Sequence, residues 1–595
     1  MYDALGLPIS DKWETRTRIL FYIVGMLTGG ILTYTTRHFI NGDAINYIEM
    51  GEALRFGNWQ DFVNFTASPG YAALLGLGQI LLNTDRANEI PLLKTVNFGC
   101  MIVAMWACDL LLRSLKKHYT DLIGENETPL PWFMIMALAY GMFLFCALAW
   151  VRPRLVAPEM AVLAVVLLSM TFILDIRRDP TPYGKFCLLG LSSGIAYLLK
   201  TFFFPFSVFF FLVAGLACGS IRKAIPRVTV SVVIMLLVCS PWLLALSSKL
   251  GHLSYGETGS LNYGIYVKAE GESIHSPVLL TEAPQVLLYQ DTPFENSTRP
   301  ATFDPSYWKI GIKPVFDLRA HARLFVEHIC QISSDQPGLF LAVLLWLVWS
   351  ARIGSLKIGR FRPLSVQLCL ALPAIIGIAM YSIIHVEMRY LAPFMFFIFV
   401  ALVLCPRHNA SNRSLAQKSM VSALIPLMVI LGSSVGTVVD QSLRSLVSTG
   451  EKISHKEAFC QMMAVRDYLK NVGVEGRSQV ALVGIPPSYW GRMAGVKISA
   501  EIPKDEEILS ATPEKRKRSV ETLRSVGVNT VVAKGKDYGK LMSEGWELVP
   551  GTMDYYVYTG KEKPWEPSQM ADLREGSPVA ASAPAAPSVP VTGHR

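Results

Sequence analysis

The sequence has few charged residues for its length. Only 17% of its 595 residues are Asp, Glu, Lys or Arg, whereas soluble domains usually carry about 25%. Hydrophobic residues make up 51% of the chain. This balance excludes an ordinary soluble protein and predicts a polytopic α-helical membrane protein. The net charge of +9 then indicates membrane topology and contact with lipid headgroups, and we expect no nucleic-acid partner.

Several sequence patterns are missing, and each absence narrows the function. The ten cysteines show no metal-site spacing; only Cys330 and Cys460 lie outside the apolar runs, and whether they pair stays open. No Gly-x-Gly-x-x-Gly or Walker motif occurs in the soluble part, so we assign it no nucleotide. The first apolar run is too long for a cleaved signal peptide and no Ala-x-Ala site follows it. The middles of the apolar runs hold almost no ionisable residues, which disfavours a transporter with charges at the bilayer midplane.

Apolar runs of nearly bilayer length predict about eleven transmembrane helices, with an upper limit of 13. The expected spans are 18–36, 92–112, 131–150, 158–176, 185–200, 202–219, 227–247, 338–352, 365–385, 390–405 and 419–440. Basic residues recur in every second connection, which places the N-terminus in the cytoplasm. Residues 70–82 are apolar but too short to cross, and counting them would break this alternation. We therefore expect them to form an interfacial or re-entrant helix.

The alternation also predicts the domain organisation. Residues 1–440 form a membrane domain with two long external loops, at about 37–91 and about 248–337. In the second loop, residues 316–326 combine helical apolar spacing with basic residues. This pattern is typical of a helix on the membrane surface, and a packed helix of a small external subdomain is the alternative.

The last part of the chain predicts a small external α/β domain at residues 441–563. Its expected elements are helices at 456–471 and 514–526, strands at 478–484 and 528–534, and a closing hairpin at 546–559. The basic run 515–518 suits a solvated helix face, with a phosphate or acidic-lipid contact as the alternative. Residues 564–595 are rich in Pro and Ala and are predicted to be disordered.

Asp43 is the first candidate functional residue. It follows the first apolar run in the sequence Gly42-Asp43-Ala44, at the expected membrane surface. A carboxylate at this place can serve as an acid or base toward a lipid-linked substrate. The alternative is an acid that caps the following helix, because Asp is a favoured N-cap residue. The local sequence does not decide between the two.

Four external segments together resemble the GT-C superfamily of glycosyltransferases. They are Gly42-Asp43 through Pro69-Gly70-Tyr71, Arg152-Pro153-Arg154 through Glu159, Leu198-Leu199-Lys200-Thr201, and His385 through Arg389-Tyr390-Leu391-Ala392-Pro393. The resemblance covers about residues 15–405 and is nearest to the protein O-mannosyltransferase and aminoarabinose transferase branch, in its bacterial form. It implies a GT-C fold and an enzyme that moves a sugar from a polyprenyl-phosphate carrier to an acceptor hydroxyl on the external face, usually with inversion.

The resemblance also implies roles for individual residues. Asp43 corresponds to the general base, and Glu159 would orient the acceptor or a metal, or else pair with Arg152 or Arg154. Cations are needed around the departing phosphate, and the candidates are Lys94, Arg152, Arg154, Lys200 and Arg389. Each of these cations has an alternative role in snorkelling to the headgroups. The secondary candidates are Glu52, His385 and Glu387, and His385 also suits a structural hydrogen bond.

The sequence departs from the protein O-mannosyltransferases at two points. Asp43 is followed by Ala44 rather than by Glu, and Ser68-Pro69-Gly70 stands in place of His-Pro-Pro. These differences argue against a close protein-mannosylating role. They also leave metal dependence open, because some relatives use a divalent ion such as Mg or Mn and others do not. No cofactor is therefore certain.

The Pro-Gly-Tyr sequence at residues 69–71 is common in bacterial members, so we expect a bacterial inner membrane and a periplasmic C-terminal domain. The acceptor is a lipid, a glycan or a protein, and no short motif reports the donor sugar or the oligomeric state. Two other functions stay open on the sequence alone. One is a lipid or sugar transporter or flippase, and the other is a non-catalytic membrane assembly protein.

Overall fold

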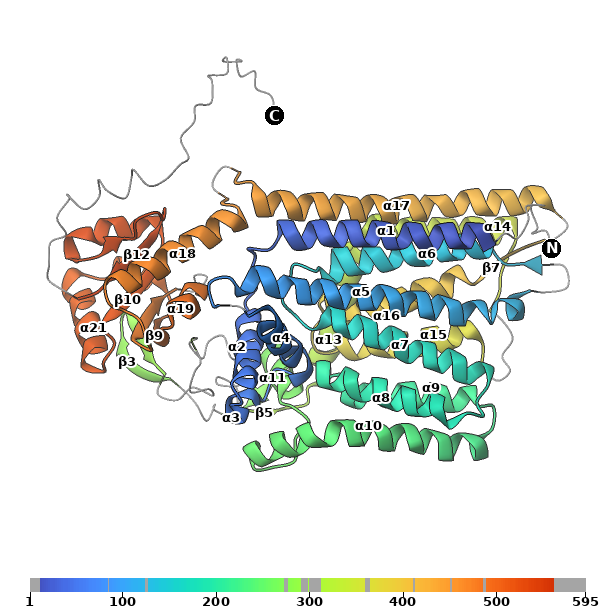
Figure 1. Cartoon of the computed structure of the whole chain (residues 1–595), viewed down its shortest axis with the longest axis horizontal. Helices are drawn as coiled ribbons and strands as arrows, with labels where there is room; N and C mark the ends of the chain where they lie inside the picture. The colour runs from blue at the N-terminus through green and yellow to red at the C-terminus, as the bar shows by residue number, and fades with distance from the viewer. Residues whose placement is uncertain are drawn as a thin grey trace, which may run out of the picture.

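The computed structural model describes residues 11–83, 85–123, 127–271, 277–289, 298, 312–358, 364–409, 412–449, 452–484 and 488–560. Within these ranges, eleven helices lie side by side in one elongated bundle (Figure 1). They are α1 (Asp11–Thr35), α5 (Glu89–Lys116), α6 (Trp132–Phe145) with its π-helical continuation η2 (Cys146–Val151), α7 (Glu159–Arg178), α8 (Tyr183–Leu199), α9 (Phe203–Ala217), α10 (Ile221–Leu250), α14 (Pro337–Ile353), α15 (Val366–Ser382), α16 (Met388–Val403) and α17 (Arg413–Leu446). Each apolar run that was expected to cross the membrane is therefore helical.

Helix length separates these helices into two groups. By length and composition, α1, α5, α6 with η2, α7, α10 and α17 can each cross a membrane. A seventh crossing results if α13 (Leu318–Asp335) and α14, which meet at an angle of 84°, count as one span. The helices α8, α9, α15 and α16 have only 15 to 17 residues. The bundle indicates a multi-pass membrane protein, and the total of about eleven spans stays a prediction.

The centre of the bundle is α6 with η2. In their most apolar stretch, 94% of the residues are buried, against 22% in α10. The outer helices instead turn large apolar side chains away from the protein, among them Leu237 and Leu244 on α10, Leu344 on α14 and Met428 on α17. An apolar surface on this scale is expected where helices contact lipid.

The first loop forms three helices at one end of the bundle: α2 (Ala44–Arg55), α3 (Trp59–Phe62) and α4 (Pro69–Leu82) (Figure 1). The short apolar run 70–82 is thus helical, as expected, and lies within the 14 residues of α4. Helices α2 and α4 cross with their backbones in contact. A Cβ atom on Gly76 would lie 2.6 Å from the carbonyl oxygen of Gly51, so the crossing requires glycine.

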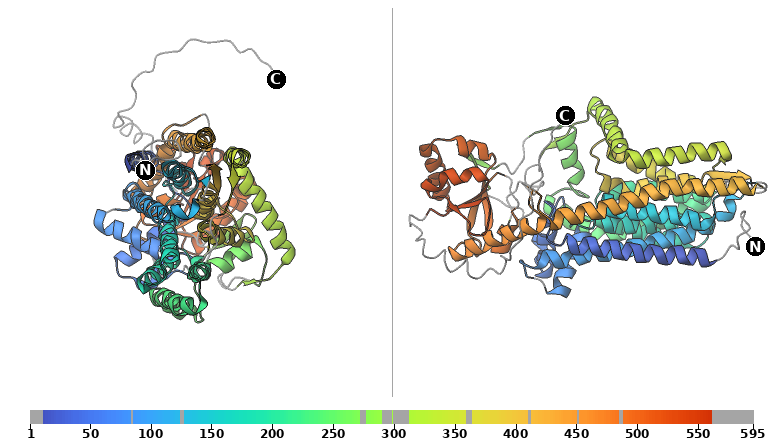
Figure 2. Two further views of the ribbon diagram at one scale, coloured as in Figure 1. Left: turned by 90° about the vertical axis from the view of Figure 1, so that its right-hand side faces the viewer. Right: turned by 90° about the horizontal axis from the view of Figure 1, so that it is seen from above.

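The second loop contributes α11 (Thr258–Tyr266), the paired strands β2 (Ala269–Glu270) and β5 (Lys313–Pro314), and α13. Figure 2 shows α13 projecting sideways from the bundle before the chain turns into α14. Most of the amphipathic run expected at 316–326 therefore lies in a longer helix, which begins at Leu318. One side of α13 packs on the end of α15, where the His328 ring bonds the Ser382 carbonyl at 2.7 Å. Its other side exposes Val326.

The C-terminal domain is built on a seven-stranded sheet with the order β11-β12-β10-β8-β9-β4-β3. Strands β8 (Gln479–Val483), β9 (Lys497–Ile502) and β10 (Thr530–Lys534) are parallel, and β11 (Glu547–Leu548) and β12 (Tyr555–Tyr558) form the expected hairpin. The hairpin β3 (Val278–Glu282) and β4 (Gln285–Leu288) comes from the second loop and pairs with β9. The sheet therefore joins two segments that lie about 200 residues apart in the chain. No pattern in the sequence predicted this pairing.

Five further elements complete this domain: α18 (His455–Asn471), α19 (Tyr489–Ala494), α20 (Asp505–Ser510), α21 (Pro513–Ser525) and η4 (Lys536–Glu544). Helices α18 and α21 agree with the expected helices to within one residue. The predicted disordered tail 564–595 lies outside the described residues. At the opposite end of the bundle are the turn η1 (Tyr119–Leu122) and a small sheet of β1 (Glu127–Thr128), β7 (Pro406–Asn409) and β6 (Ser355–Leu356).

Candidate active site

Asp43 precedes α2 directly and occupies the N-cap position of that helix. Its side chain nevertheless accepts no capping hydrogen bond, so the capping role considered for it is not what the structure shows. The side chain is 66% exposed, and its Oδ2 lies 3.7 Å from Nη2 of Arg389. The carboxylate is thus open to a ligand and faces a cation that comes from the opposite half of the sequence.

Arg389 is held in the turn that starts α16. Its side chain is only 14% exposed, and its Nε lies 3.1 Å from a carboxylate oxygen of Glu387. Its Nη2 donates to the Tyr390 hydroxyl at 3.2 Å, and His385 approaches Glu387 at 3.8 Å. The interaction with His385 and the charge of Arg389 lower the pKa of Glu387 against the opposing effect of burial. Glu387 therefore stays ionised and holds the guanidinium in place.

Lys200 and Glu159 form a buried ion pair beside this turn. Lys200 lies between α8 and α9, Glu159 is the first residue of α7, and their charged atoms are 3.0 Å apart. The ammonium of Lys200 also lies 3.2 Å from the centroid of the Tyr390 ring, which is close enough for a cation–π interaction. The second carboxylate oxygen of Glu159 is buried and has no hydrogen-bond partner among the described residues. Glu159 therefore pairs with Lys200 and not with Arg152 or Arg154.

Tyrosines complete this cluster, and they are not among the candidates selected from the sequence. The Tyr266 ring, on α11 of the second loop, stacks on His385 with centroids 4.0 Å apart. The rings of Tyr381 and Tyr390 are 5.4 Å apart. Tyr390 lies inside a motif quoted for the resemblance, so a signal for it existed. Tyr266 had no signal in the sequence.

Three of the predicted cations form a separate group. Lys94 on α5 is fully buried, donates to the backbone carbonyl of Arg154, and lies 5.6 Å from the Phe39 ring, which Arg154 also covers at 4.9 Å. Arg152 has a positive φ of 64° and donates to the Ala149 carbonyl at 2.8 Å. Lys94 thus contacts the turn between η2 and α7 through the Arg154 carbonyl, and Arg152 bonds back to η2 from that turn. The three cations therefore lie at the turn that precedes Glu159, and none of them pairs with a carboxylate of the Asp43 cluster among the described residues.

His455, at the start of α18, borders the same group. Burial and the nearby charges of Arg154, Lys94 and Arg444 lower the pKa of His455 to about 4, so the imidazole is neutral at pH 7. Its ring packs on Phe39 with centroids 4.6 Å apart. The C-terminal domain therefore contacts the membrane domain at this group.

The hydrogen-bond partners of Glu52 lie outside the Asp43 cluster. Its carboxylate bonds Arg86 at 3.1 Å and Arg492 of the C-terminal domain at 2.9 Å. Burial opposes its ionisation, but the two guanidinium groups outweigh burial and hold the pKa of Glu52 below its usual value. This secondary candidate thus belongs to the contact between domains, and no recorded bond places it in the Asp43 cluster.

The described residues show no group of three or more His, Cys, Asp or Glu side chains that would hold a metal ion. The three carboxylates of this cluster face cations, because Asp43 and Glu387 lie beside Arg389 and Glu159 pairs with Lys200. This donor set does not suit Mg or Mn, which prefer several convergent oxygen ligands. Cys330 and Cys460 are both exposed and unpaired.

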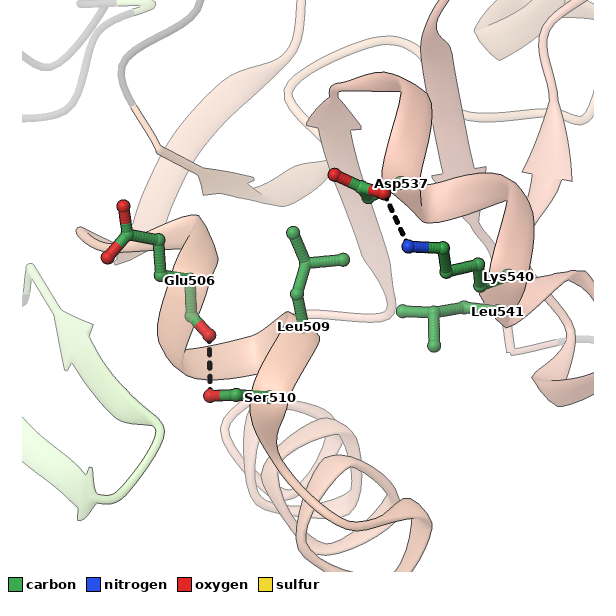
Figure 3. Close-up of a pocket in the computed structure, with 6 residues that line it drawn as sticks. All are labelled: Glu506, Leu509, Ser510, Asp537, Lys540 and Leu541. Atoms are coloured by element: carbon green, nitrogen blue, oxygen red, sulfur yellow. Dashed lines mark hydrogen bonds and ion pairs between the residues drawn. The ribbon is translucent and has the colours of Figure 1, made fainter.

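A cavity of about 350 Å³ lies in the C-terminal domain between α20 and η4 (Figure 3). It is lined by Glu506, Leu509, Ser510, Asp537, Lys540 and Leu541. Its lysine and aspartate pair with each other at 2.6 Å. None of the residues predicted from the sequence lines this cavity.

No family model matches the chain, and no curated protein matches it. Among solved structures, ArnT from Cupriavidus metallidurans in the apo state aligns with a TM-score of 0.49 and 13% identity, covering 91% of this chain and 97% of that chain. The same protein bound to undecaprenyl phosphate gives 0.49 and 12%, covering 91% and 98%. The Archaeoglobus fulgidus oligosaccharyltransferase in complex with Zn and sulfate gives 0.44 and 10%, covering 86% and 68%. At these scores the similarity carries no argument about fold or activity.

Proposed function

We propose that this chain is an integral-membrane glycosyltransferase that moves a sugar from a polyprenyl-phosphate carrier to an acceptor hydroxyl. The observation that carries the proposal is the Asp43 carboxylate, which is exposed, free of a capping bond and 3.7 Å from Arg389. Six of the ten residues selected from the sequence meet in this cluster: Asp43, Glu159, Lys200, His385, Glu387 and Arg389. The sequence resemblance described above supports the same reaction.

Asp43 acts as the general base. A general base must lie within hydrogen-bond reach of the proton that it removes, and the exposed carboxylate leaves room for an acceptor hydroxyl. The acceptor oxygen attacks the anomeric carbon and its proton passes to Asp43. A new carbon–oxygen bond forms as the bond to the carrier phosphate breaks, and the electron pair leaves with the polyprenyl phosphate. One displacement of this kind inverts the anomeric centre.

Arg389 and Lys200 stabilise the departing phosphate. Negative charge grows on that group in the transition state, and positioned cations stabilise it most where water is excluded. A phosphate that accepts hydrogen bonds from Arg389 competes with Asp43 for the guanidinium. Donor binding therefore releases the Asp43 carboxylate from its ion pair and leaves it available as a base. Glu387 and Glu159 hold the two cations in position.

We also propose on which face of the membrane the site lies. The site lies at the end of the bundle where the first-loop helices and the C-terminal domain lie (Figure 1). We assign this end to the external face of a bacterial inner membrane, with the N-terminus in the cytoplasm. The carrier lipid reaches the site from the bilayer, and the acceptor, whether lipid, glycan or protein, approaches from the periplasm. No step uses a metal ion.

The test compares membranes that contain wild-type chain, Asp43→Asn or Asp85→Asn at matched expression. Asp85 is a control because it is an exposed acid of the same loop whose recorded bonds are to Asn88. Mass spectrometry follows a panel of polyprenyl-phosphate sugars and the release of polyprenyl phosphate. We expect wild type and Asp85→Asn to consume one donor, and Asp43→Asn to be slower by about 10²- to 10⁴-fold.

Equal donor consumption by Asp43→Asn and wild type would remove Asp43 as the base. A donor that crosses the membrane unchanged would favour the transporter or flippase. Binding without turnover in all three proteins would favour an assembly protein.

A further inference from the structure

Arg492 connects the C-terminal domain to the helix that carries Asp43. It lies on α19, and its side chain is fully buried. Its guanidinium donates to both carboxylate oxygens of Glu89, at 2.6 and 3.0 Å, and to Glu52 at 2.9 Å. Glu49 lies 3.8 Å away. One buried arginine therefore binds the start of α5 and two successive turns of α2.

The carboxylates around Arg492 would repel each other without it. Glu49 also accepts from the backbone N–H of Thr298, Glu89 accepts from the Tyr489 hydroxyl, and Glu52 also pairs with Arg86. These bonds reduce the repulsion, but Arg492 is the recorded cation that contacts all three acids. Removing one partner of a buried ionic cluster is strongly destabilising, because the remaining charges stay desolvated.

A contact that holds α2 in place also holds Asp43, because Asp43 directly precedes this helix. Glu49 and Glu52 lie on α2, six and nine residues after Asp43, so about one and a half to two and a half turns of helix separate them from it. Asp43 itself has no capping bond, and its ion pair with Arg389 is long at 3.7 Å. The position of its carboxylate is therefore set mainly by the position of α2.

We propose that Arg492 is a positioning residue for the transfer reaction: by clamping Glu52, Glu49 and Glu89, it fixes α2 and thereby Asp43. The inference rests on the proposed role of Asp43 as the base. It makes the C-terminal domain a part of the active-site scaffold, although none of its described residues contacts Asp43 in a recorded bond. A displacement of about 1 Å at a reacting group can reduce the rate on the order of 10²-fold.

The experiment uses the full-length protein in lipid nanodiscs and compares wild type with Arg492→Lys and Arg492→Gln. Arg516→Lys is the matched control, because Arg516 is a buried arginine of the same domain that pairs with Glu544 and bonds the end of α20. Two readouts are needed: kcat and KM per folded molecule, and hydrogen–deuterium exchange of the α2 amides. Arg492→Lys keeps the charge and loses the forked geometry, so it provides an intermediate case if Arg492→Gln does not fold.

We expect kcat to fall about 10-fold in Arg492→Lys and about 100-fold in Arg492→Gln with KM nearly unchanged, while α2 exchanges faster in the same order. Arg516→Lys should change neither quantity. Wild-type kcat in folded Arg492→Lys, or unchanged α2 exchange, would overturn the inference. Exchange does not depend on the reaction: faster α2 exchange in a chain without transfer activity would keep the clamp and reject the proposed function instead.

Discussion

Gly76 on α4 contacts the backbone of Gly51 on α2, so we expect Gly76→Ala to push these two helices apart. The added Cβ atom would lie 2.6 Å from the Gly51 carbonyl oxygen and 3.2 Å from its carbonyl carbon and Cα. All three atoms belong to the backbone, and no side-chain rotation can relieve the contact. The helices must therefore separate by several tenths of an ångström.

The change in folding free energy caused by Gly76→Ala is the sum of two opposing effects. Overpacking of a tight contact costs about 1–3 kcal/mol, while alanine is favoured over glycine in a helix by about 1 kcal/mol. The net destabilisation of Gly76→Ala is therefore about 0–2 kcal/mol. Because α2 moves and carries Asp43 with it, we expect the transfer rate to fall as well.

The assay is thermal unfolding in one detergent, together with the transfer rate at a temperature where all variants are folded. Gly99→Ala on α5 is the control, because a Cβ atom there meets nothing within 4 Å. It should stabilise the protein by roughly 0.5–1 kcal/mol through helix preference alone. If Gly76→Ala unfolds at or above the temperature of Gly99→Ala, the crossing of α2 and α4 is looser than described and the reasoning fails.

Three further predictions concern charged groups and thiols. Lys200→Met leaves the buried Glu159 carboxylate unpaired and should cost about 3–5 kcal/mol, whereas the double variant with Glu159→Gln should recover much of this loss in denaturant unfolding. The pKa of Glu52 is lowered in the folded state, so its contribution to folding stability is complete above its unfolded pKa of about 4.3 and is lost as the pH falls further. The rate at which limited proteolysis releases the C-terminal domain should therefore be constant from pH 6 to 8 and rise on acidification. Glu52→Gln should reduce that rise. Cys330 and Cys460 are exposed, so both should react with maleimide in the folded protein without reduction, and labelling of neither would indicate a disulfide.

Much of the bundle could be predicted because its signal is local. An apolar run such as 158–176 predicts its own helix, which the structure places at Glu159–Arg178. The basic residues at alternate connections predict the topology, which stays a prediction. Asp43 and Arg389 could be selected as candidates for the same reason, since each lies directly beside an expected span end. The pairing of Lys200 with Glu159 was not predicted, because it depends on how α7, α8 and α9 pack and not on sequence spacing.

The contact between the domains was beyond sequence reasoning. Glu52 lies on a helix of the first loop and Arg492 lies 440 residues further on, so no pattern within either segment relates them. The α2–α4 crossing was missed for a similar reason, because a glycine in a helix indicates close approach only once the partner is known. Tyr266 enters the cluster through the folding of the second loop, whose path is not encoded by hydrophobic periodicity.

The donated hairpin β3–β4 has a consequence for biogenesis. Strand β9 pairs with β4, yet β4 is synthesised before α14, α15, α16 and α17, and β9 after them. In the order of synthesis, the hairpin must therefore remain without its final partner strand until those four helices have been made. An unpaired strand edge is an aggregation hazard, so the interval between synthesis of the second loop and synthesis of the C-terminal domain is the vulnerable period in the assembly of this protein.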